Sequence, residues 1–265
     1  SILSTLIDIP KYKIQRIQIF TELCLHESFC NKTQYLDGIN RVLVSYLSIQ
    51  SLIPYSLNLI AALSKHEHTC RMLADNGVIE LFTQGFLSSI KVDTKVSHQI
   101  LRNVARNYKS IPQASLIVSC LMQELLSDLD NRNSIIGTIT SIVNVMPSSI
   151  QEHDVQRIII PEISHGSHQF VLYGLQLLSV CDQSTFRNNY MSVFDIVVQI
   201  LNNQIMLYPE IIKMALNVML NLILQYDLGE LLAKIEFPRY LTELSQLFQP
   251  SDSICESINQ LLNII

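Results

Sequence analysis

Seven segments of this chain carry the same short pattern, which returns about every forty residues. In each segment one marker position is followed at once by an apolar residue. In six of the seven, another apolar residue stands two positions before the marker, and in five a small residue stands six positions before it. A helical repeat of this length predicts a solenoid, in which each unit must stack on its neighbours. The marker positions are Cys24, Ala62, Asn103, Asn144, Ser179, Asn221 and Asn263.

The periodicity of the chain is helical almost throughout, and the alternation typical of strands is not sustained anywhere. Apolar residues recur at spacings of three and four. Ser110, Pro112 and Gln113 match a capping box, which predicts that a helix begins at Ser110. We expect one all-α repeat domain over 1–265 that is a fragment of a longer protein. An irregular repeat is expected near 147–170, where the marker spacing shortens to 35 residues.

The composition suits a chain with a large core and argues against several classes of partner. Hydrophobic residues make up 48% of the chain and charged residues only 15%, so burial of apolar surface can offset the ordering entropy. The formal net charge of −5 argues against nucleic acid, because binding to phosphates usually needs a basic surface. No apolar stretch is long enough to cross a bilayer, so we expect no membrane span.

The six cysteines show no C-x-x-C spacing, and several lie within apolar helical stretches. Free cysteine in such a stretch behaves as a small hydrophobic residue. We therefore expect a reducing compartment, which means the cytoplasm, with the nucleus as a second option.

Several segments resemble the armadillo repeat. In that family a Gly introduces the second helix of each repeat, because the sharp turn before it favours positive φ. Gly38 and Gly77 stand in this position and are 39 residues apart. The third helix of the family carries a small residue, an apolar residue and then an Asn, as around Asn103 and Asn221. The segments that carry the resemblance are 36–43, 75–82, 100–105, 219–222 and 237–241.

The resemblance implies an all-α, right-handed α-α superhelix, an armadillo-like solenoid of about six to seven repeats. HEAT repeats are the nearest alternative and would account for the divergent middle of the chain. The resemblance also implies that the third helices line a concave groove, where Asn side chains bond to the backbone of an extended peptide. The implied groove residues are Asn103, Asn144, Asn221 and Asn263, with Gln99, Thr140, Asn217 and Asn259 one turn earlier.

Two further features bear on what the groove would bind. Armadillo proteins of the importin-alpha type pair each Asn with a Trp, and this chain has no Trp, so we do not expect a receptor for nuclear-localisation signals. His98, Arg102, Arg106 and Lys109 form the densest basic cluster. The cluster is either an anchor for an acidic or phosphorylated segment, with Arg102 and Arg106 setting specificity, or a solvated face of one helix.

The sequence offers no constellation for catalysis or metal binding. His66 and His68, and likewise His165 and His168, are interpreted as surface histidines, because a tetrahedral metal site needs three or four converging ligands. No Gly-rich phosphate loop and no nucleophile elbow occur in the chain. We expect no enzyme, no cofactor and no small-molecule substrate.

The expected function is a non-catalytic scaffold that binds an extended peptide or protein partner in its groove. One alternative is a structural subunit or spacer of a large cytoskeletal or ciliary assembly. That role would use the outer helix faces, and aromatic residues there would favour it. Another alternative is the GTPase-binding regulatory region of a diaphanous-type formin, which would require formin-homology segments beside this chain.

Overall fold

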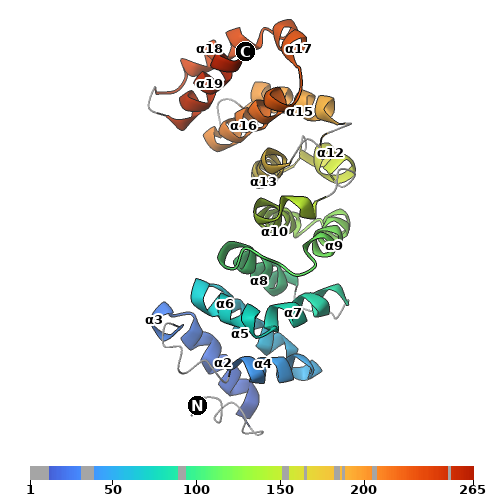
Figure 1. Ribbon diagram of the computed structural model, residues 1–265, viewed down its shortest axis with the longest axis vertical. Coiled ribbons are helices and arrows are strands. Elements are labelled where there is room, and N and C mark those ends of the chain that lie inside the picture. The colour runs from blue at the N-terminus through green and yellow to red at the C-terminus, as the bar shows by residue number, and fades with distance from the viewer. Residues whose placement is uncertain are drawn as a thin grey trace. The chain divides into compact units, whose positions relative to one another are not determined.

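The computed structural model describes residues 12–30, 39–88, 94–150, 155–163, 166–181, 186, 189–204, 208–249 and 252–265. All regular structure in these ranges is helical, and they contain no strand (Figure 1). The sequence predicts one repeat domain over 1–265, and the structure divides that range into two compact units. Unit 1 is Ser1–Ser149 and unit 2 is Ile150–Ile265.

Unit 1 is built from two rows of helices. In the first row α2 packs against α5, α5 against α8, and α8 against α10. In the second row α4 packs against α7, and α7 against α9. The first row consists of α2 (Lys13–Cys24), α5 (Ile53–Ser64), α8 (Thr94–Asn107) and α10 (Arg132–Val145). The second consists of α4 (Ile39–Leu47), α7 (Val78–Leu87) and α9 (Ala114–Ser127), and the short helices are α3 (Glu27–Cys30), η3 (Gln50–Leu52), α6 (Glu67–Asp75) and η4 (Pro147–Ser149).

Unit 2 has the same plan. Its first row runs from α13 to α16 to α19, each packed against the next. The other helices lie beside this row, with α12 against α13, α15 against α16, and α18 against α19. The row consists of α13 (His168–Val180), α16 (Pro209–Gln225) and α19 (Ser253–Ile264). The helices beside it are α12 (Ile160–Ile163), α15 (Tyr190–Gln204), α17 (Gly229–Lys234) and α18 (Phe237–Ser245).

The segment 147–170, where the sequence predicts an irregular repeat, contains short and unusual helices. It includes the 3-10 turn η4, the π-helical turn η5 (Val155–Ile159) and the four-residue helix α12. Gly174 permits a close approach of α12 to α13, because a Cβ at this position would lie 2.6 Å from Cγ1 of Ile163.

All seven marker positions lie in the first rows, one in each of seven helices that we call the marker helices: α2, α5, α8, α10, α13, α16 and α19. The residues around each marker explain the repeated pattern. The apolar residues two positions earlier are buried, at Ile60, Leu101, Ile142, Leu177, Met219 and Leu261. The small residues six positions earlier are also buried, at Ser56, Ser97, Thr138, Ala215 and Ser257. Small side chains allow neighbouring helices to approach closely, and the predicted all-α repeat solenoid is confirmed.

The turn before α7 also follows the sequence prediction. Gly77 has φ +73° and directly precedes the first residue of α7. Gly38 lies outside the described residues. Glu236 has φ +50° in the corresponding place before α18, although it is not a glycine.

The predicted helix start at Ser110 is wrong, because α9 begins at Ala114. Gln113 has φ +56° and stands outside the helix, so it cannot complete a capping box. The preceding segment is instead held by Ile111, whose side chain is buried and whose main-chain N–H points at Sδ of Met146, 3.4 Å away. Burial of an apolar side chain has overridden the local capping preference.

Candidate functional site

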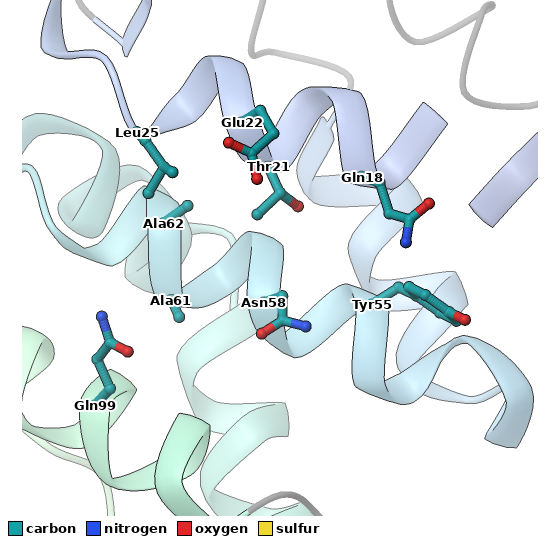
Figure 2. Close-up of a pocket in the computed structure, with 9 residues that line it drawn as sticks. All are labelled: Gln18, Thr21, Glu22, Leu25, Tyr55, Asn58, Ala61, Ala62 and Gln99. Atoms are coloured by element: carbon teal, nitrogen blue, oxygen red, sulfur yellow. The ribbon is translucent and has the colours of Figure 1, made fainter. Parts of the chain in front are cut away.

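Unit 1 contains a hollow of about 390 Å³ between three successive marker helices. Three amide side chains surround it: Gln18 from α2, Asn58 from α5 and Gln99 from α8. Figure 2 shows these side chains around one opening, with Thr21 and Glu22 on the side of α2 and Tyr55 on α5. Gln99 is one of the groove residues that the sequence predicts.

The hollow exists because α5 presents small residues at its floor. Ala61 and Ala62 line it and are 6% and 2% exposed. Ala62 occupies the marker position that holds Asn103 in the next repeat, so α5 presents a shorter side chain to the lining here. The Thr21 hydroxyl donates to the main-chain oxygen of Ile17 at 2.8 Å. Glu22, which is exposed, is the one charged side chain in the lining.

Two marker asparagines bond to the preceding marker helix of their own unit. The Asn103 amide nitrogen donates to the main-chain oxygen of Ala61 at 3.2 Å and to Oγ of Ser64 at 3.0 Å. In unit 2 the Asn221 amide donates to the main-chain oxygen of Ser179. These bonds tie the last turn of one marker helix to the next helix. In both residues the amide oxygen has no partner among the described residues, so it can still accept a hydrogen bond.

The other predicted groove residues lie in varied surroundings. Asn144, Asn259 and Asn263 are exposed. Thr140 is buried and donates to the main-chain oxygen of Ile136 at 2.8 Å. Asn217 is half-buried, and its amide oxygen lies 3.4 Å from the Ser257 hydroxyl. Peptide binding by these side chains stays a prediction.

The four residues of the basic cluster do not form one surface, and an anchoring role for Arg102 and Arg106 stays a prediction. His98 is fully buried, and its Nε2 lies 3.2 Å from Oε2 of Glu124 on α9. Arg102 donates to the Ser134 main-chain oxygen, to the Ser134 hydroxyl and to the Thr138 hydroxyl, at 3.0 to 3.1 Å. These two residues therefore join α8 to its neighbours.

Arg106 and Lys109, the other two members of that cluster, are exposed. Lys109 follows the end of α8 with φ +59°. Arg106 lines a second, larger hollow of unit 1, together with Lys65 and Arg71.

The described residues hold no group of three His, Cys, Asp or Glu side chains placed to bind a metal ion. His66 and His68 line the larger hollow beside Arg106. His168 lies at the start of α13, where its Nε2 is 2.9 Å from Oε1 of Glu210 and its ring packs edge-on against Tyr208. His165 lies outside the described residues. None of the helices in the described ranges combines the length and the apolarity that a membrane crossing needs.

Sequence reasoning missed two of the three amides around the smaller hollow. Asn58 stands four residues before the marker Ala62, the same register as Gln99 before Asn103. The register is therefore visible in the sequence, although the armadillo resemblance implies groove residues only beside the asparagine markers. Gln18 stands six residues before Cys24, a position that is small in most repeats, so nothing in the sequence pointed to it.

No protein-family model and no curated protein matches this chain. Solved structures do. An engineered protein matches 99% of the chain over 67% of its own length, with 12% identity and a TM-score of 0.72. A designed armadillo repeat protein in complex with the peptide (KR)4 matches 83% of the chain over 98% of its own length, with 10% identity and a TM-score of 0.61. At such identities the likeness concerns the fold alone, and the chain has an armadillo-like helical repeat fold.

Proposed function

We propose that this protein is a non-catalytic binding scaffold that captures an extended segment of a protein partner across the marker helices of unit 1. The observation that carries the proposal is the hollow of about 390 Å³ with one amide side chain from each of three successive marker helices. A row of amides at the repeat spacing suits a ligand that is itself periodic, and an extended peptide is such a ligand.

The chemistry of the lining supports main-chain recognition. Each amide side chain carries both a donor and an acceptor, so it can pair with a peptide N–H, a peptide C=O or both. The alanine floor leaves room for the backbone to approach α5, and Glu22 is the only side chain in the lining that favours one sign of charge. The designed armadillo repeat protein of similar fold was solved with a bound peptide, which supports the same use of the fold here.

The proposal also includes where the protein acts. All six cysteines are free, and five of them are buried, which is consistent with a reducing compartment such as the cytoplasm. The likeness to designed repeat scaffolds supports a role without catalysis. Use of the outer faces in a large assembly has less support, because Tyr12 is the only exposed aromatic residue in the described ranges.

The test begins with a linear peptide selected against the protein from a random displayed library. Its affinity is then measured for the wild type, for Gln99→Ala and for the control Gln123→Ala. Gln123 is an exposed residue of α9 whose side chain has no bond to another described residue. Loss of one hydrogen bond at Gln99 is expected to weaken binding by about three- to tenfold.

The double variant Asn58→Ala with Gln99→Ala should weaken the same peptide further, while Gln123→Ala should bind like the wild type. Circular dichroism of each variant checks that the helix content is unchanged. Equal affinity of the peptide for all four proteins would show that it binds elsewhere and would reject the proposal, as would a library that yields no binder.

A further inference from the structure

The second hollow of unit 1 has a volume of about 670 Å³ and lies where α5 and α8 end. Every residue in its lining is polar or charged. Gln99 of the smaller hollow and Arg106 of this one are seven residues apart on α8, which corresponds to about 10 Å along the helix. The two hollows are therefore separate sites on the same helices.

The lining has an excess of unpaired positive charge, although the chain as a whole has a net charge of −5. Arg71 is paired with Glu67, with Nη2 2.7 Å from Oε1. Lys65 and Arg106 are exposed, and their side chains have no ion pair or hydrogen bond with any described residue. Glu27 is the one remaining acidic side chain in the lining.

Beside these two cations the lining contains one amide and two histidine rings, which can supply further donors. The Asn107 amide donates to the main-chain oxygens of Ser64 and Lys65, at 2.7 and 3.0 Å, so these two carbonyls have a partner. His66 and His68 also line the hollow. The Nε2 atom of His66 is buried and lacks a hydrogen-bond partner among the described residues. A buried nitrogen without a partner is costly unless a ligand satisfies it.

We propose that this hollow is a binding site for a phosphate group. A phosphate monoester carries nearly two negative charges and three acceptor oxygens, which matches two free cations, an unsatisfied ring nitrogen and a neighbouring histidine. The group can come from a phosphorylated side chain of a protein partner or from free phosphate. The proposal goes beyond peptide capture, since it uses neither Asn58 nor Gln99.

Two probes are titrated into the full chain at low salt, because screening weakens exposed charge pairs. One is inorganic phosphate, and the other is a blocked Ala-phosphoserine-Ala tripeptide, with its unphosphorylated form as the blank. The NMR ring signals of His66 and His68 report binding. We expect saturable shifts of these signals with both phosphate probes and none with the blank.

Three variants test whether the phosphate probes bind in this hollow. Arg106→Ala should weaken both probes by about tenfold, because it removes a charged donor. Glu27→Gln should strengthen them about two- to threefold, because it removes a repelling carboxylate. Arg157→Ala, which removes an exposed arginine of unit 2, is the charge-matched control and should leave the affinity unchanged.

Tighter binding of the tripeptide than of inorganic phosphate supports a modified partner as the source, and equal binding supports free phosphate. The proposal is overturned if the His66 and His68 signals do not saturate, or if Arg106→Ala and Arg157→Ala behave alike. Weaker binding in Glu27→Gln would also overturn it, since that result shows that the Glu27 carboxylate does not repel the bound probe. Affinity of the Gln99→Ala variant for inorganic phosphate should equal that of the wild type, which separates this site from the peptide groove.

Discussion

A marker asparagine such as Asn103 can recur in a repeat protein because it binds a ligand or because it joins neighbouring repeats. The resemblance to the armadillo repeat implies an amide that faces a bound peptide, whereas in the structure the Asn103 amide nitrogen donates to two groups of α5. The Ser64 hydroxyl also donates to the Ala61 oxygen, at 3.0 Å, so the three groups form a small network between the two helices. An asparagine that recurs at the repeat spacing can therefore be selected by the packing of repeats as well as by a ligand.

The network leads to a prediction for stability. Asn103→Ala should lower the free energy of unfolding by about 1–2 kcal/mol, because it removes two hydrogen bonds from a partly buried site. Asn144→Ala is the matched control in the same register, since the Asn144 side chain is exposed and bonds to no described residue. Urea unfolding followed by circular dichroism measures both. Equal loss of stability in the two variants would contradict the docking role of Asn103.

At the scale of helices, the sequence predicted the elements that repeat and failed where packing overrides local preference. The marker helices were predictable because the same buried positions recur in each of them. The turn before α9 was not, because its conformation follows from the burial of Ile111 and not from the polar residues Ser110 and Gln113 around it. Gly77 could be predicted, since a left-handed turn residue has a clear preference for glycine.

In the candidate site, too, the repeating positions were predictable and the features that depend on packing were not. Gln99 was predicted because it precedes a marker asparagine by one turn. The hollow itself was not, because it depends on what is missing at Ala61 and Ala62, and an alanine in a helix gives no signal of the space beside it. The larger hollow was equally hidden, since Lys65 and Arg106 come from different repeats and meet only where α5 and α8 end.

One glycine just before α7 and another inside it allow a test of the turn before this helix. Gly77 has φ +73°, so Gly77→Ala should destabilise the protein by about 1–2 kcal/mol through backbone strain. Gly85 lies inside α7 and an added Cβ would meet nothing within 4 Å, so Gly85→Ala should stabilise the protein by about 0.5–1 kcal/mol. A Cβ at Gly77 also meets nothing within 4 Å, so sterics with neighbours do not confuse the comparison. Thermal unfolding should show opposite shifts of the midpoint, and shifts of the same sign would contradict this account of the turn.

At the scale of the whole molecule, each unit has its own row of marker helices and its own buried core. In a repeat stack a helix contacts mainly its neighbours, so stability is close to a sum of local terms. Asn103 and Asn221 are equivalent positions in the two units, and each bonds to the marker helix before it. The effect of removing either amide should therefore stay within its own unit.

Amide hydrogen exchange of the native protein can test this expectation. Asn103→Ala should raise exchange in α5 and α8 and leave α13 and α16 close to the wild type, whereas Asn221→Ala should do the reverse. The physical reason is that the free energy of a local opening depends only on the contacts that are lost when that segment separates from its neighbours. Asn144→Ala provides the baseline for a substitution without a lost bond. If either variant raised exchange evenly over both units, the chain would unfold as one cooperative body, and the description of stability as a sum of neighbouring contacts would fail.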